Sequence, residues 1–215
     1  MGYLSDIPHH RKSAVHVPRP SEEAQQKAKK YLKGNDVGIF ARSRALYGRN
    51  LPPEFYIKLI IFLEDLGYNP IWLGEKQSVL PCPVDHIVDF SRMPESRNLE
   101  LTLSIISNLK FTVQFWTAST RLASMMDVPW ILFESPDQIA GNGQEGRRIA
   151  LTTDYNKKKI VLSHYCSVAE NHDAALKVLH KAIDEMKNDN WDDVFGLLED
   201  VEIVRQMAKK QLEWR

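Results

Sequence analysis

Short apolar runs alternate with amphipathic segments along most of this 215-residue chain, and this alternation limits the fold more than any other feature. Each run is short and mostly apolar, which is typical of a strand covered on both faces. The six runs are VGIFA (37–41), NPIWLG (69–74), HIVDF (86–90), KFTVQF (110–115), WILFE (130–134) and IVLSHY (160–165). Strands that alternate with helices predict an α/β fold with a single Rossmann-like, doubly wound parallel sheet of about six strands.

The two ends of the chain fall outside this alternation. Residues 1–20 are polar and interrupted by prolines, so we expect a connector there. Residues 21–187 would form the Rossmann-like domain, which begins with a helix that Ser21 caps and Gly34 ends. Residues 188–215 would add a C-terminal helix.

The bulk composition excludes several classes of partner. The 28 basic and 28 acidic residues balance, so no overall field attracts nucleic acid or an anionic membrane. No apolar run approaches the roughly 20 residues that span a bilayer, and the N-terminus lacks the apolar centre of a signal peptide. Cys82 and Cys166 lie far apart in the sequence and have no metal-binding spacing, so we interpret them as reduced intracellular thiols. We therefore expect a cytoplasmic protein with no transmembrane segment and no nucleic-acid partner.

Chemically unusual residues gather in the stretches that follow the predicted strands. Ligands of open α/β sheets bind outside the carboxyl ends of the strands, and this rule selects residues 41–50, 74–78, 115–121 and 134–144. The second stretch opens with Gly74 and Glu75. Neither a Gly-x-Gly-x-x-Gly pattern nor a P-loop pattern occurs in the chain, so dinucleotide and P-loop interpretations lose their usual support.

The first of these stretches is strongly basic. It contains Arg42, Arg44 and Arg49, followed by Asn50, and no acidic residue within it neutralises them. Arginine suits phosphate because its guanidinium group is a fixed fork of donors whose charge cannot be lost. Phosphates commonly lie where the first strand ends and the strand order reverses. The stretch therefore predicts phosphate contact, with a solvated basic loop as the alternative.

A hydroxyl-rich turn follows the fourth predicted strand. Thr117, Ala118 and Ser119 stand where a helix begins, which leaves backbone N–H groups open to an anion, and Arg121 lies about one turn into that helix. An ordinary helix cap is the alternative. Glu134 closes the fifth predicted strand, where a carboxylate can hold ribose hydroxyls or simply end the strand.

The sequence does not reveal an arrangement for catalysis by this chain alone. His86 is interpreted as a structural residue, and no nucleophile and base have the required spacing. Asp85 and Asp89 do not form a convincing metal-binding pair. We therefore expect a binding site that uses neither a metal ion nor another cofactor.

Four segments in this order resemble the C-terminal half of GT-B glycosyltransferases, and most nearly the heptosyltransferase-like enzymes. They are PRPSEEAQQKAKKYL, VGIFARSRALYGRNLPPEFY, LGYNPIWLGEKQS and LSIISNLKFTVQFWTASTRLASMMDVPWILFESPDQ, and they cover about residues 18–140. The Arg-x-Arg…Arg-Asn spacing is similar to that of some family members, and residues 117–121 are faintly similar to a fucosyltransferase motif. Where the family's turn reads Asn-Asp-Ser-Gly-Pro-Met-His, residues 115–121 read FWTASTR.

This resemblance implies a domain that binds the nucleotide-sugar donor or its nucleoside diphosphate. The three arginines would neutralise the diphosphate in place of a metal ion. The acceptor site and the catalytic base would come from an N-terminal-type domain or a partner chain, so hexosyl or heptosyl transfer would need both halves. We expect this chain either to bind such a domain or to self-associate.

A non-catalytic module is the alternative. A Rossmann-like scaffold can also bind a protein partner or sense a nucleotide. The last predicted helix carries an apolar stripe that suits a protein partner: Trp191, Val194, Leu198 and Val201. In the GT-B fold the final helix packs back on the other domain, which would account for the same stripe.

Overall fold

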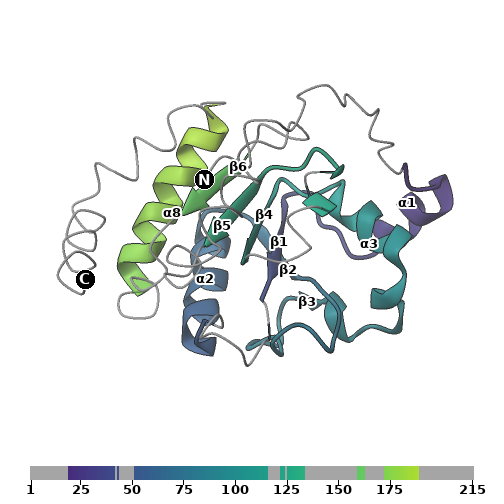
Figure 1. The fold of residues 1–215 in the computed structure, drawn as a ribbon, viewed down its shortest axis with the longest axis horizontal. Helices are drawn as coiled ribbons and strands as arrows, with labels where there is room; N and C mark the ends of the chain where they lie inside the picture. The colour runs from purple at the N-terminus through teal and green to yellow at the C-terminus, as the bar shows by residue number, and fades with distance from the viewer. Residues whose placement is uncertain are drawn as a thin grey trace, which may run out of the picture.

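The computed structural model describes residues 19–41, 43, 51–115, 122–123, 125–133, 159–162 and 172–188. These residues form a six-stranded sheet with helices around it (Figure 1). The strands are β1 (Asp36–Phe40), β2 (Asn69–Trp72), β3 (Val88–Asp89), β4 (Phe111–Phe115), β5 (Trp130–Phe133) and β6 (Lys159–Leu162). The predicted α/β fold with a single sheet of about six strands is confirmed.

All neighbouring strands are parallel, and their order is β3-β2-β1-β4-β5-β6. The chain places β2 and β3 on one side of β1 and then crosses to the other side for the remaining strands. β1 is therefore bonded on both sides, with Ile39 level with Trp72 of β2 and Val113 of β4. This order makes the sheet doubly wound and puts its reversal between β1 and β4.

Helices cover both faces of the sheet (Figure 1). On one face lie α2 (Pro53–Asp65) and α8 (His172–Lys187), and on the other lie α1 (Glu22–Ala28) and α3 (Leu99–Ile106). Two short 3-10 helices, η1 (Phe90–Arg92) and η2 (Pro94–Arg97), lead from β3 to α3. Each face has its own apolar core because successive strand residues point to opposite faces. The α2 side buries Val37, Ile39, Phe55, Leu59, Phe111 and Val113, and the α3 side buries Phe40, Ile71, Leu73, Leu101 and Ile105.

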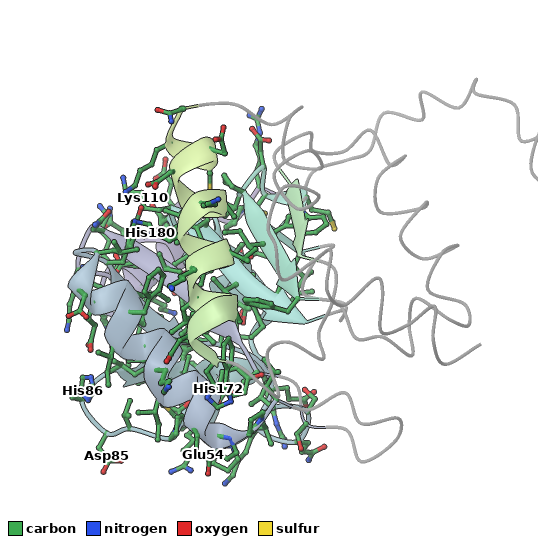
Figure 2. The ribbon with its side chains drawn as sticks, turned by 90° about the vertical axis from the view of Figure 1, so that its left-hand side faces the viewer. Glu54, Asp85, His86, Lys110, His172 and His180 are labelled. Atoms are coloured by element: carbon green, nitrogen blue, oxygen red, sulfur yellow. The ribbon has the colours of Figure 1, made fainter. Side chains whose placement is uncertain are left out.

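The contact between α2 and α8 depends mainly on apolar packing. Leu179 of α8 is fully buried in the shared core. The ring of His172 packs edge-on against Phe55, with centroids 5.6 Å apart, and Figure 2 shows this histidine at the beginning of α8. Lys58 Nζ lies 2.8 Å from Asp173 Oδ1, but both side chains are exposed, so solvent screens this ion pair and it adds little to stability.

The start of the first helix is confirmed. Ser21 caps α1, since its side chain accepts the N–H of Ala24 at 3.3 Å. The N–H of Ser21 in turn donates to Glu100 Oε1 at 2.8 Å, which ties α1 to the first turn of α3. This backbone hydrogen bond holds the pKa of the Glu100 carboxyl below its usual value.

The predicted end of the first helix at Gly34 is wrong, because α1 ends at Ala28. The following residues form turns, in which the N–H of Tyr31 donates to the carbonyl of Ala28 at 3.0 Å. The Tyr31 ring packs edge-on against Phe90 of η1, with centroids 5.0 Å apart. This tertiary contact favours the turns over further helix, and Gly34 lies instead in the loop before β1, with φ of +105°.

Two predicted segments lie almost entirely outside the described residues: the connector (1–20) and the C-terminal helix (188–215). The domain boundaries therefore stay predictions. Among the helices that the structure describes, none has the length and apolar character needed to cross a membrane.

Asp36 closes the loop at the amino end of the central strand. Its side chain is buried, and its carboxylate accepts the N–H of Lys33 at 2.9 Å and that of Gly34 at 2.6 Å. Hydrogen bonds to a charged acceptor are stronger than those between neutral groups. The carboxylate therefore fixes the backbone of the loop that leads into β1.

We expect Asp36→Asn to lower the free energy of unfolding by about 1–3 kcal/mol, because the N–H groups of Lys33 and Gly34 lose a buried, charged acceptor. Urea unfolding measures this change. Asp65→Asn is the matched control, since Asp65 is exposed at the end of α2, and it should change the stability by less than about 0.5 kcal/mol. Equal stability of the two variants would show that the Asp36 carboxylate does not hold this loop.

Candidate functional site at the sheet reversal

The carboxyl ends of β1 and β4 lie side by side at the reversal of the strand order. Phe40, the last residue of β1, is level with Gln114, the last residue but one of β4. The basic stretch (41–50) and the hydroxyl-rich stretch (115–121) therefore start from neighbouring strand ends. Open α/β sheets bind their ligands at this position.

Most of the predicted site residues lie outside the described residues, so their part in a site stays a prediction. They are Arg42, Arg44, Arg49, Asn50, Thr117, Ala118, Ser119, Arg121 and Glu134. Two predicted residues, Gly74 and Glu75, lie within the described residues.

The segment that follows β2 turns back onto the segment that follows β1. The N–H of Leu80 donates to the carbonyl of Ala41 at 2.8 Å, and the N–H of Ser43 donates to the carbonyl of Ser78 at 2.9 Å. Trp72 Nε1 adds a third bond, to the carbonyl of Leu80 at 2.9 Å. The backbone at the start of the basic stretch is therefore tied to the loop after β2.

Gly74 and Glu75 form the tight turn from which this loop starts. Gly74 has φ of +127°, and a Cβ there would collide with Cγ1 of Val79, so the turn requires glycine. The carbonyl of Glu75 accepts both the N–H of Ser78, at 2.8 Å, and its hydroxyl, at 3.1 Å. The Glu75 side chain is exposed. The turn thus supports the basic stretch, whereas contact of either residue with a ligand stays a prediction.

The carboxylate of Asp89, at the end of β3, interacts with residues of the turn that follows it. Asp89 Oδ1 accepts the hydroxyl of Ser91 at 2.5 Å, and Oδ2 lies 3.2 Å from Nε of Arg92. Nearby, burial raises the pKa of the half-buried Cys82 thiol, which therefore stays protonated near neutral pH. No group of three or more His, Cys, Asp or Glu that could hold a metal ion is found in the part of the chain that the structure describes.

The sequence reasoning missed Gln114. Thr112 and Gln114 occupy alternate positions of an otherwise apolar strand, and both side chains are fully buried on the face of the sheet opposite α2. Within the described residues, the Thr112 hydroxyl and both polar atoms of the Gln114 amide have no hydrogen-bond partner. Two polar residues in the run KFTVQF were the signal that could have singled out this strand.

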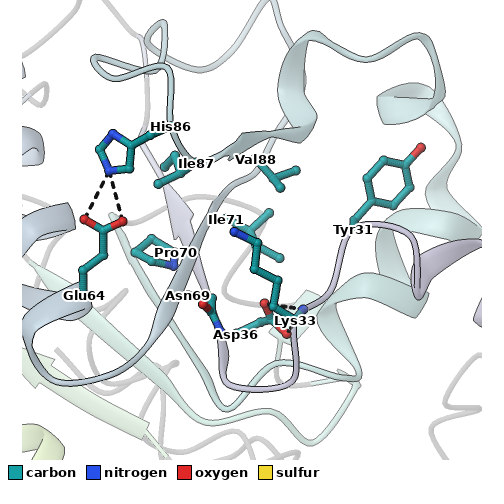
Figure 3. A pocket seen from close by; sticks show the side chains of 10 residues that line it. All are labelled: Tyr31, Lys33, Asp36, Glu64, Asn69, Pro70, Ile71, His86, Ile87 and Val88. Carbon is teal, nitrogen blue, oxygen red and sulfur yellow. Dashed lines mark hydrogen bonds and ion pairs between the residues drawn. The ribbon is translucent and has the colours of Figure 1, made fainter.

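A small hollow lies at the opposite edge of the sheet, beside the amino ends of β1 and β2 (Figure 3). Its volume is about 30 Å³, and its lining includes Lys33, Asn69 and His86. Such a volume holds one or two water molecules, which is far too little for a nucleotide. His86 Nε2 lies 3.0 Å from Glu64 Oε1, which agrees with the interpretation of this histidine as a structural residue.

The fold is that of a Rossmann-like α/β domain. Among the comparisons with known proteins, matches come from the solved structures alone. A scan against protein-family models found no match, and a search of curated proteins found none either.

Two solved structures are similar in fold. A glycosyl transferase of family 9 from Veillonella parvula DSM 2008 aligns with a TM-score of 0.52 at 12% identity, over 78% of this chain and 52% of that chain. The E. coli heptosyltransferase WaaC, solved with ADP, aligns with a TM-score of 0.46 at 15% identity, over 76% of this chain and 48% of that chain. At such identity the first likeness establishes the fold alone, and at that level it confirms the resemblance to GT-B glycosyltransferases. The chain spans about half the length of each of these proteins.

We expect Gly74→Ala to be more destabilising than Gly67→Ala. Both glycines have positive φ, +127° and +81°, and an alanine in a left-handed conformation costs about 1–2 kcal/mol. No described heavy atom lies within 4 Å of a Cβ built at Gly67, whereas one built at Gly74 meets Val79. Urea unfolding of the two variants therefore measures how much the larger φ of Gly74 and the collision with Val79 together add to the cost of an alanine.

Amide hydrogen exchange adds a local test of the same variants. In Gly74→Ala the amides of Ser43 and Leu80 should exchange faster, because the displaced turn weakens their hydrogen bonds. In Gly67→Ala these two amides should keep their protection. Unchanged protection in both variants would show that the turn does not support the segment after β1.

Proposed function

We propose that this chain is the donor-binding domain of a GT-B-type glycosyltransferase, which binds a nucleotide sugar through its diphosphate at the sheet reversal. The observation that carries this proposal is the position of the basic stretch. The stretch starts at the end of β1, and β1 borders the reversal with β4. The likeness of fold to a family 9 glycosyl transferase supports the same assignment.

The diphosphate would be neutralised by Arg42, Arg44 and Arg49, with Asn50 as a neutral donor beside them. The hydrogen bonds of Ala41 and Ser43 to the loop after β2 support this role for the first arginine. A backbone that is already fixed on both sides of a binding residue loses less entropy when the ligand binds. Arginine also accounts for phosphate binding without a divalent cation, since its charge is permanent.

The stretch after β4 would complete the anion site. Backbone N–H groups of residues 117–119 would donate to the phosphates, with Arg121 as a further cation. Glu134, which follows β5, would accept ribose hydroxyls. Gly74 and Glu75 would act mainly through the turn that supports the basic stretch.

The chemical contribution of this domain would be to stabilise the leaving nucleoside diphosphate. Donors aimed at a developing charge lower the barrier because they need no reorganisation during the reaction. The acceptor site and a general base would belong to a second domain or a partner chain. This division fits the coverage, since the chain spans about half of the family 9 protein.

A nucleoside diphosphate should bind more tightly than its monophosphate, and its affinity should fall as salt rises. Calorimetry with ADP, GDP and UDP measures both effects. Arg42→Ala or Arg44→Ala should weaken binding by about 1.5–3 kcal/mol, which is the range for a hydrogen bond to a charged group. The unfolding midpoint should hardly change.

Lys110→Ala is the matched control, because it removes one positive charge at the opposite edge of the sheet, beside Asp36. Figure 2 shows Lys110 far from Glu54, which lies at the beginning of α2. This control should bind diphosphates as the unmodified chain does. Equal affinity for nucleosides with and without phosphate would contradict the proposed function and favour the protein-interaction module.

A further inference from the structure

Gln114 lies at the edge of the sheet where the proposed ligand binds. Its side-chain amide is buried and has no hydrogen-bond partner among the described residues. Its side chain is 0% exposed, and neither Nε2 nor Oε1 is bonded to any part of the described chain. Buried polar side chains in folded proteins are nearly always hydrogen-bonded, so an exception needs an explanation. An apolar residue of similar size would fill the same space without this cost.

The position of Gln114 suggests the explanation. It is level with Phe40 of β1 on one side and with Leu132 of β5 on the other. Only one residue of β4 separates it from the carboxyl end of that strand. Gln114 is therefore next to the carboxyl end of β1, the strand that leads into the basic stretch.

Within the described residues, no hydrogen bond holds the amide away from that edge. A glutamine side chain has three rotatable torsions, so its amide can be reoriented without a backbone movement. A side chain with hydrogen bonds would have to break them first. Gln114 has none to break within the described part of the chain.

We propose that the Gln114 amide binds a vicinal diol of the ligand, with Oε1 accepting one hydroxyl and Nε2 donating to the other. This assignment rests on the proposed function, in which the arginines bind the diphosphate. A neutral group with one acceptor and one donor face matches a diol. Both the ribose and the transferred sugar carry such diols, and each adjoins the diphosphate.

Thr112 provides the matched control. Its hydroxyl is also buried on the same face, and it also has no partner among the described residues. It lies two residues farther from the carboxyl end of β4, which is roughly 7 Å along the strand. Thr112→Val removes a comparable polar group at a depth that the ligand does not reach.

The experiment compares Gln114→Met and Thr112→Val in urea unfolding and in calorimetry. Methionine keeps the unbranched shape of glutamine, and Gln114→Leu serves as a second variant if the first does not fold. The ligands are whichever of ADP, GDP and UDP binds the unmodified chain most tightly, its 2′-deoxy analogue and its glucose conjugate. Both variants should be at least as stable as the unmodified chain, since an unpaired polar group is removed.

Gln114→Met should lose about tenfold in affinity, the equivalent of one or two hydrogen bonds. If the ribose diol is bound, the loss appears with the nucleoside diphosphate and is smaller with its 2′-deoxy analogue. If the sugar diol is bound, the loss appears only with the glucose conjugate. Thr112→Val should bind all three ligands as the unmodified chain does.

Three results would overturn the assignment while leaving the proposed function intact: unchanged affinity of Gln114→Met for all three ligands, an equal loss in Thr112→Val, or a marked loss of stability in Gln114→Met alone. The last result would mean that the amide already has a structural partner. If the unmodified chain binds no nucleoside diphosphate, the proposed function itself is contradicted, and the assignment of Gln114 with it.

Discussion

The bonding of β1 to a strand on each side is the constraint on which the rest of the structure depends. At the centre of β1, side-chain atoms of Leu109 and Leu73 lie 2.7 and 2.8 Å from the point where a Cβ of Gly38 would be. A larger residue would therefore push these side chains away from the sheet. Because β2 and β4 both run parallel to β1, the carboxyl ends of all three strands lie at one edge of the sheet. This edge is where the strand order reverses.

The two edges of the sheet differ in how their polar groups are used. At the amino edge, the Asp36 carboxylate binds backbone N–H groups and His86 pairs with Glu64, so these groups serve the fold. At the carboxyl edge, the backbone beside the basic stretch is fixed by the loop after β2. The Gln114 amide there has no partner within the described residues. Departures from good packing and pairing are expected where a protein binds its ligand.

Local sequence signals predicted much of the fold. Mostly apolar runs predicted six strands, and Pro53 together with the apolar stripe of the second helix predicted α2 correctly. The end of α1 could not be predicted from Gly34, because the turns after the helix pack against a residue far along the chain, as Tyr31 does against Phe90. Such contacts between distant residues override local propensity.

The candidate site was predictable only in part, for the same reason. The rule that ligands bind at the carboxyl ends of strands selected the stretches that start from the strand ends at the sheet reversal, among them the one that opens with Gly74 and Glu75. The pairing of Ser43 with Ser78, and of Ala41 with Leu80, could not be foreseen, since it joins segments that the whole of α2 separates in sequence. Gln114 passed unnoticed because a single glutamine in a strand has no local meaning until its burial and its lack of a partner are known.

The central claim is that the ligand binds at the sheet reversal and not at the hollow on the opposite edge. Backbone amide shifts in NMR spectra, recorded while ADP, GDP or UDP is added, test it most directly. The largest shifts should fall on amides of the carboxyl edge: Ser43, Gly74, Ser78 and Phe115. Largest shifts on Lys33, Asn69 and His86, which line the hollow at the amino edge, would contradict it.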